Sequence, residues 1–272
     1  MVKVRWLGAA GIEFTHEGDS WLLDPYFSRW GKLKVLLGRV APKKAAIETA
    51  LASLNGELRA IIVSHTHFDH ALDVPEIAQR FEGPILGGAS LNTLFDRYGR
   101  GGRVTVCAGG ESIDLPGGAR VTMLTSLHGK ALFNKVPYPG EIEPGGAPPV
   151  KAAEYRHGQN FICMFEVGGT TFAHSGSANL IDESLMGRRC DVLFMCLPFW
   201  QNTPDYHRRL VGALKPKVVI PFHFDDFSKP FKPDGSAPDL PLLKRREFMD
   251  RLREAAPDTR VIIPRTNQIM DF

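Results

Sequence analysis

The sequence predicts an α/β fold, an αββα sandwich in which two mixed β-sheets pack together and helices flank them. Short apolar, strand-like segments dominate both halves of the chain, and in each half they lead into alternating strands and helices. With 43% hydrophobic and 23% charged residues among 272, the chain can also bury a core of that size. We expect a single domain over residues 1–272, because no linker separates the halves.

The first half opens with brief β-branched or aromatic runs that glycine or polar turns separate. An alanine- and leucine-rich helix follows, and then a continuous apolar run that suits a strand buried on both faces. The expected elements are strands at 2–7, 11–15 and 20–24, a helix at 41–55, a strand at 58–64, helices near 73–81 and 89–97, and strands near 84–87 and 103–107.

The second half repeats this order, and we expect strands at 120–125, 161–167, 170–174, 192–197, 218–221 and 260–263, with helices near 204–214 and 241–255. Three insertions break the pattern, near 29–44, 129–151 and 228–241. Long irregular segments in a compact domain are usually functional or mobile, so all three are candidate lids.

The insertion 29–44 carries six basic residues and no acidic one, with leucine, valine and tryptophan between them. We interpret it as a solvated insertion that buries its leucines against its own domain. Membrane contact, a dimer contact, and capping of an anionic substrate by Arg29, Lys32 and Lys34 stay open as alternatives.

The charge balance argues against nucleic acid as a partner. The 33 basic and 30 acidic residues leave a net charge of +3, whereas a general polyanion binder needs a larger basic excess. The four cysteines form no Cys-x-x-Cys pair, and we interpret them as buried small hydrophobic side chains. The first residues lack the pattern of a secretion signal, and no apolar run is long enough to span a membrane. We therefore expect a cytoplasmic protein.

Residues 65–70 read His-Thr-His-Phe-Asp-His and directly follow a buried strand. The end of such a strand is where α/β proteins expose ligand-binding residues. His65 and His67 lie two apart and can converge on one ion. Asp69 and His70 lie on the following turn and can face a second ion. Imidazole suits Zn, Fe, Ni or Cu, and the carboxylate keeps Zn, Mn and Fe plausible, so we expect one or two divalent ions with Zn as first candidate.

The hexad has the form His-x-His-x-Asp-His, the signature of the metallo-β-lactamase superfamily, and the chain resembles that superfamily over nearly its whole length. Segments 6–11 (WLGAAG) and 22–26 (LLDPY) resemble the start of its L-ascorbate-6-phosphate lactonase-like branch. N-acyl-phosphatidylethanolamine phospholipase D-type enzymes begin similarly. The resemblance implies the metallo-β-lactamase fold.

The resemblance also implies two metal sites, composed of His65, His67 and His128 for the first site and of Asp69, His70 and His223 for the second. The two remote histidines, His128 and His223, again follow apolar strand-like runs. Asp69 would orient the attacking water or ligate the second ion, as its family counterpart does.

One departure from the family concerns the carboxylate that bridges both metals, which usually lies in a Gly-Asp-Thr or Gly-Asp-Ser-Gly turn. The matching turn, Phe172–Ser177, contains no carboxylate. The best register places His174 at the bridging position, and a shift by one places Ser175 there. His174 is therefore an uncertain further ligand or a packing residue. Without the anionic bridge, the second ion should bind more weakly.

These residues predict a metal-dependent hydrolase in which a metal-bound hydroxide attacks an ester, lactone or phosphodiester bond. The alternatives are a phospholipase D-like phosphodiesterase and a metal-binding sensor that has lost turnover. We expect a small, anionic substrate, because bound dications would attract it into the pocket. An oligomer is possible.

Several other polar residues are candidates for supporting roles. Asp24, Asp225 and Asp226 are possible partners for the N–H groups of ligating histidines. His157 follows the second insertion and either lies at the surface or contacts substrate, and His207 has the appearance of a surface residue.

Overall fold

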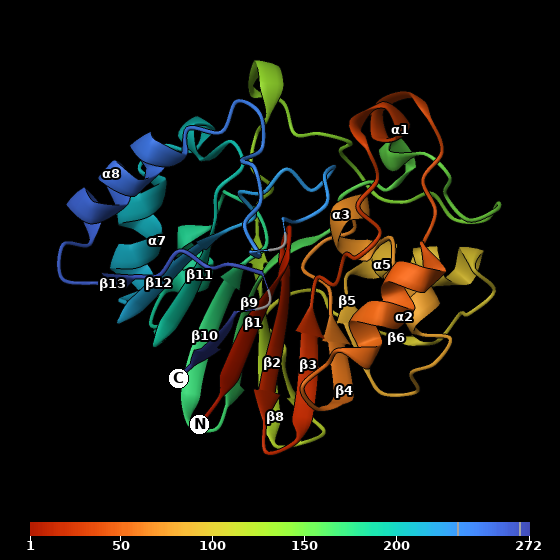
Figure 1. Cartoon of the computed structure of the whole chain (residues 1–272), viewed down its shortest axis with the longest axis horizontal. Coiled ribbons are helices and arrows are strands. Elements are labelled where there is room, and N and C mark those ends of the chain that lie inside the picture. Colours follow the sequence, from red (N-terminus) through yellow and green to blue (C-terminus); the bar gives the residue numbers. More distant parts are fainter. Residues whose placement is uncertain (233, 267) are drawn as a thin grey trace.

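Figure 1 shows the computed structural model of the chain, which describes residues 1–232, 234–266 and 268–272. Two seven-stranded sheets pack face to face, one in the order β14-β1-β2-β3-β4-β5-β6 and the other in the order β13-β12-β11-β10-β9-β8-β7. Helices cover the outer face of each sheet, with α2 and α5 on one side and α7 and α8 on the other (Figure 1). The predicted αββα sandwich of two mixed sheets is confirmed.

The first sheet uses the first part of the chain together with the last strand. Its strands are β1 (Lys3–Gly8), β2 (Gly11–His16), β3 (Asp19–Leu23), β4 (Glu57–Ile62), β5 (Ile85–Gly87), β6 (Val104–Val106) and β14 (Ile269–Asp271). Its helices are α1 (Lys32–Leu37), α2 (Lys44–Ala52), α3 (Phe68–Ala71), α4 (Val74–Ile77) and α5 (Ala89–Arg97). Strands β3 to β6 are parallel, whereas β14, β1, β2 and β3 pair antiparallel. The pairing of β14 with β1 joins the last strand of the chain to the first.

The second sheet has the same mixed character. Its strands are β7 (Ser112–Leu115), β8 (Ala119–Ser126), β9 (Asn160–Val167), β10 (Thr170–Ser175), β11 (Val192–Cys196), β12 (Val218–Phe222) and β13 (Arg260–Val261). Its helices are η1 (Leu132–Asn134), η2 (Ala152–Glu154), α6 (Asp182–Leu185), η3 (Trp200–Asn202), α7 (Tyr206–Leu214) and α8 (Arg245–Ala255). Strands β10 to β13 are parallel, and β7 to β10 are antiparallel.

Aromatic side chains fill the space between the sheets. The ring of Phe14 on β2 lies 4.5 Å from that of Phe165 on β9 and 4.8 Å from that of Phe172 on β10. Tilted aromatic pairs at such distances add to the free energy gained from burial. These side chains belong to the buried cluster that joins the two sheets.

The structure adds elements that the sequence did not predict, among them α1, α3, α6, β7 and β14. Strand β14 has three residues and α6 has four, too few for a clear hydrophobic period, and the four residues of β7 alternate over too short a span to stand out. Helix α1 buries none of its residues. His207 is buried, which corrects the interpretation of it as a surface residue. All four cysteines are buried and unpaired, as predicted. Within the described residues, no helix combines the length and apolar character that a bilayer span requires.

The insertions lie together at one edge of the sandwich, where α1 and the segment after β8 rise above α3 (Figure 1). The prediction that 29–44 buries its leucines is wrong, because Leu33, Leu36 and Leu37 are exposed, and it is Trp30 and Val35 that pack against the core. The insertion 228–241 is irregular, and its residue 233 lies outside the described residues.

The same edge collects the segments that carry the candidate ligands. Asp24 directly follows β3, residues 65–70 follow β4, and His223 directly follows β12. Parallel strands present their carboxyl ends at one edge of a sheet, and in this fold those edges of both sheets meet. Residues that are far apart in the sequence thereby face one cavity.

Candidate metal centre

The structure brings the six predicted ligands together as two groups of three. In each group the potential ligand atoms all lie within 4.8 Å of one another. The first group consists of His65, His67 and His128, and the second of Asp69, His70 and His223. The rings of His65 and His70 lie 3.8 Å apart between centroids, so the two groups are neighbours.

The first group presents three imidazole nitrogens to one point. Nε2 of His65 and Nδ1 of His67 are 3.2 Å apart. On the far sides of these rings, His67 Nε2 donates to the carbonyl oxygen of Pro137 (2.9 Å) and His128 Nδ1 donates to that of Gly129 (2.7 Å). A carbonyl can only accept, so the opposite nitrogen of each ring carries a lone pair directed at the group.

The tautomer of His65 follows from the residue before it. The Ser64 hydroxyl donates to Asp24 (2.5 Å), so its oxygen is left to accept a hydrogen bond from His65 Nδ1 (3.1 Å). Nε2 of His65 is then also unprotonated. Three lone pairs that face each other at this distance repel one another unless a cation lies between them.

Burial keeps the first group neutral. It lowers the pKa of His65 and His128 well below the usual histidine range, and the neighbouring histidines add to the effect. For His67, burial lowers the pKa to about 4. Neutral imidazole is the form that binds metal.

The second group contains the only formal negative charge among the six ligands. Nε2 of His223 lies 3.3 Å from Oδ2 of Asp69. Burial acts to raise the pKa of Asp69, but the hydrogen bond with His223 and the nearby His70 outweigh it and lower that pKa. Asp69 is therefore a carboxylate at neutral pH. Nδ1 of His223 has no hydrogen-bond partner within the described part of the chain.

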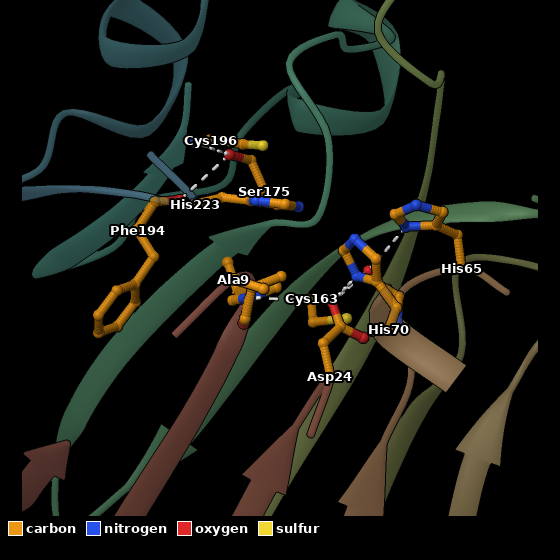
Figure 2. A network of polar contacts seen from close by, with 12 residues as sticks. Ala9, Asp24, His65, His70, Cys163, Ser175, Phe194, Cys196 and His223 are labelled. Atoms are coloured by element: carbon orange, nitrogen blue, oxygen red, sulfur yellow. Dashed lines mark hydrogen bonds and ion pairs between the residues drawn. The ribbon is translucent and has the colours of Figure 1, made fainter. Parts of the chain in front are cut away.

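Asp24 supports both groups from beneath (Figure 2). Its Oδ2 accepts a hydrogen bond from His70 Nδ1 (2.8 Å), and through Ser64 it also reaches His65. Burial acts to raise the pKa of Asp24, and the contacts with His70 outweigh it and lower that pKa. The prediction that Asp24 supports a ligating histidine matches this geometry.

The other two candidate carboxylates have a different role. Asp225 forms an ion pair with Arg29 (2.8 Å) and accepts a hydrogen bond from the Ala9 amide (2.9 Å), while Asp226 pairs with Lys32 (3.0 Å). These contacts fix the loop that follows His223 to the insertion 29–44. They also neutralise two of the three cations that were expected to meet an anionic substrate.

His174 does not join either group. It is fully buried, and its Nε2 donates to the carbonyl oxygen of Ala10 (2.9 Å). Its neighbour Ser175 is hydrogen-bonded to the β11 backbone, and neither residue is among those that line the cavity. The sequence register that placed His174 or Ser175 at the bridging position therefore disagrees with the structure.

The residues of this turn that line the cavity are Gly176 and Ser177, and Ser177 lies two positions beyond Ser175. Its hydroxyl accepts a hydrogen bond from the Gly129 amide (2.9 Å). Gly176 packs so closely on Ser64 that a Cβ there would lie 2.1 Å from the serine hydroxyl oxygen. Gly176 thus matches the glycine of the family's Gly-Asp-Thr turn, and Ser177 takes the place of the aspartate. That glycine was the signal that could have set the register.

The cavity measures about 180 Å³, and the donor atoms form its floor. Its walls are mostly apolar and aromatic, formed by Phe68, Pro137, Tyr138, Phe199, Phe227 and Leu240. His157 lies behind the first group, with its ring stacked on His128 at 5.7 Å. Sequence reasoning did not find Ser177, Tyr138 or Cys196, which also lines the cavity.

The donor set fits a divalent metal. Three neutral imidazoles with converging lone pairs form the first site, and one carboxylate with two imidazoles forms the second, both within the ligand chemistry of Zn, Mn and Fe. The unpartnered Nδ1 of buried His223 is consistent with a ring held by its other nitrogen. The outer nitrogens of four of the five histidines are already engaged, as expected around a metal.

The fold and the site together define the class of this protein. It is an αββα sandwich with a cluster of histidine and aspartate side chains at one edge of its two packed sheets. The chain belongs to the beta-lactamase superfamily, because the model of the beta-lactamase superfamily domain matches residues 3–223.

Comparisons with individual proteins agree with this assignment. The chain is 29% identical over 235 residues to a UPF0173 metal-dependent hydrolase of Anaeromyxobacter dehalogenans, which covers 83% of this chain and 75% of the relative. It is 26% identical over 257 residues to a UPF0173 metal-dependent hydrolase of Staphylococcus aureus, at 90% and 98% coverage. A metallo hydrolase from Ignicoccus hospitalis shares the fold, with a TM-score of 0.63, 14% identity, and coverage of 100% and 99%.

Proposed function

We propose that this chain is a metal-dependent hydrolase that cleaves an ester, lactone or phosphodiester bond. The observation that carries the proposal is the pair of donor groups, each within 4.8 Å, on the floor of one cavity. A divalent ion, with Zn as first candidate and Mn or Fe as alternatives, would supply activation of a water and polarisation of the oxygen under attack.

The residues of this chain have distinct roles in the proposal. His65, His67 and His128 would hold one ion through nitrogens whose tautomers are already set. Asp69 is ionised at neutral pH and lies at the cavity, so it can accept a hydrogen bond from the attacking water and orient it. The apolar walls would exclude competing water from the reacting group.

The cavity walls also bear on the substrate class. No lysine or arginine lines the cavity among the described residues, so an anionic group would be recognised at the metal floor rather than by side-chain cations. The aromatic walls suit an apolar portion next to that group. Within the superfamily, this favours a phosphodiesterase similar to the N-acyl-phosphatidylethanolamine phospholipase D-type branch over a lactonase similar to the L-ascorbate-6-phosphate branch.

A sensor that binds metal without turnover is the second candidate. It is favoured by Ser177, which places a neutral hydroxyl where the family has a bridging carboxylate. The ligands would then neutralise less of the positive charge of the second ion.

Elemental analysis of protein purified without chelator, combined with an activity panel, separates these candidates. The panel holds bis(p-nitrophenyl) phosphate, a p-nitrophenyl ester and an aliphatic γ-lactone. We expect bound metal and hydrolysis of the phosphodiester, both lost in His67→Ala and retained in the control His16→Ala. Protein that binds no metal would contradict the proposal, and bound metal without turnover on any substrate would favour the sensor.

We also propose the cytoplasm as the location of the protein, because its four cysteines are all buried and unpaired.

A further inference from the structure

Four large apolar side chains project from the edge of the molecule that carries the cavity. On α1, Leu33 is 76% exposed, Leu36 70% and Leu37 84%, and Phe133 on η1 is 92% exposed. We call these four residues the apolar rim. Isolated exposed leucines are ordinary, whereas three on a single helical turn, with an exposed phenylalanine on a second segment at the same edge, are typical of an interaction surface.

The four rim residues lie on two segments, α1 and η1, at the edge of the sandwich that holds the candidate ligands. In Figure 1, α1 and the yellow-green segment that contains η1 rise above the edge at which α3 lies. Residues Pro137 and Tyr138, shortly after η1, line the cavity itself. A surface that contacts both segments would therefore lie along the edge of the sandwich that holds the cavity.

The residues on both sides of α1 are held by specific contacts, so the exposure of its leucines belongs to the folded structure. The Trp30 indole donates to the carbonyl oxygen of Ala41 (2.8 Å), and the Val40 amide donates to that of Val150 (2.8 Å). The Arg29 guanidinium lies over the Phe231 ring (3.9 Å) and pairs with Asp225. These contacts fix both ends of the insertion and leave the leucines directed away from the core.

The charge around the rim is positive. Within the insertion 29–44, the basic residues Arg29, Lys32 and Lys44 are paired with carboxylates. In the other segment, exposed Lys130 and Lys135 flank Phe133 in the sequence. Exposed Lys34 and Arg39 lie next to the leucines in the sequence. Apolar side chains surrounded by lysine and arginine are the composition that binds anionic membrane interfaces.

The same charge argues against a second copy of this chain as the occupant. In a two-fold symmetric contact the same patch lies on both partners, so the basic residues of one copy would face those of the other. An anionic surface matches the cations and the leucines at once.

We propose that the rim docks this edge of the protein onto a bilayer that contains anionic lipid, with Leu33, Leu36, Leu37 and Phe133 entering the boundary between headgroups and acyl chains. The cations beside them contact the lipid phosphates. The docked protein would open its cavity toward the membrane surface. This inference does not depend on the hydrolase activity proposed above.

Co-sedimentation with vesicles tests the proposal. We expect the full chain to bind phosphatidylglycerol/phosphatidylcholine vesicles, to bind pure phosphatidylcholine vesicles weakly, and to lose affinity as salt rises. The triple variant Leu33→Ser, Leu36→Ser, Leu37→Ser should bind at least about tenfold more weakly. Lys34→Glu with Arg39→Glu should also lower affinity on the order of tenfold. A chelator should leave binding unchanged.

The matched control is Ile269→Ser on β14, which removes an exposed apolar side chain beside the carboxyl terminus, at the opposite edge of the sandwich (Figure 1). This variant should bind as the wild type does. Absence of binding to anionic vesicles, or equal binding of wild type and triple-serine variant, would overturn the proposal. A concentration-dependent dimer that the triple-serine variant abolishes, without vesicle binding, would overturn it in favour of self-association.

Discussion

The two donor groups lie in one cavity, yet the protein supports them by different means. In the first group, each imidazole has its outer nitrogen engaged by a residue next to it in sequence or by the 129–151 insertion, and burial keeps all three rings neutral. In the second group, the support is electrostatic, from Asp69 and from Asp24 beneath His70. The first group is therefore preorganised, whereas the second depends on negative charge.

This contrast explains how the centre tolerates a serine at the bridging position. The preorganised group needs no anionic bridge, because its lone pairs already converge. Binding of an ion at the second group should be weakened, because Ser177 supplies no negative charge there. The contrast predicts that the groups will respond differently to loss of ligands, to protons and to added charge.

Removal of two ligands from the preorganised group should have the largest effect. In His65→Ala with His67→Ala, metal affinity at that group should fall by more than about 100-fold, because even outer partners of ligands contribute 10- to 100-fold. Equilibrium dialysis against Zn would measure this. If Zn affinity falls no further than it does in His16→Ala, the first group is not a preorganised metal site.

Acid should affect the metal-free first group before the second. Because the folded pKa of His67 is about 4 against 6.5 when unfolded, the unfolded chain binds more protons between these values. The free energy of unfolding should therefore fall by about 3 kcal/mol from this residue as the pH drops from 6.5 to 4. The pKa values of Asp24 and Asp69 are lowered from 3.8. The stabilisation that these two carboxylates contribute should therefore be lost only below pH 3.8. Urea unfolding of the metal-free protein measures the slope, and His67→Gln should flatten it.

Neutralisation of the buried anion should weaken the second group more than the first. Asp24→Asn removes the charge that faces His70 and keeps the size of the side chain, so affinity for the second ion should fall about 10- to 100-fold. Calorimetric titration with Zn resolves the two binding events. Asp114→Asn, at an exposed ion pair with Arg120, is the matched control. Equal weakening of both events would show that the groups share one source of stability.

Restoration of a carboxylate at the turn should strengthen the second group. Ser177→Asp should raise affinity for the second ion on the order of tenfold, because a charge within a few ångströms of a partly buried dication is weakly screened. The contrasting variant is His174→Asp, which buries an unpaired carboxylate away from the cavity and should lower stability without adding metal. Metal content and thermal unfolding of both variants distinguish the two registers.

Much of this architecture could be predicted from local sequence patterns. Apolar runs such as 58–64 mark buried strands, and the hexad that follows one of them already contains four of the six ligands. His128 and His223 were identified through the family resemblance and their position after strands. The short elements β14 and α6 carry too little periodicity to be predicted.

The exposure of the α1 leucines could not be predicted from the sequence, and the register of the turn after β10 depended on recognising Gly176 in that turn. His174 and Ser177 both suit a polar site, and only the packing of Gly176 on Ser64 determines which of them faces the cavity. The leucines of α1 have the composition of a buried face, and their exposure depends on contacts of Arg29 and Trp30 with distant residues.

The placement of Asp225 beside Arg29 has a consequence for biosynthesis. All three members of the first group lie within the first 128 residues, whereas the second group is incomplete until residue 223 has left the ribosome, and the Arg29–Asp225 pair that fixes its loop forms later still. During vectorial synthesis, the nascent chain contains every ligand of the first site well before it contains those of the second.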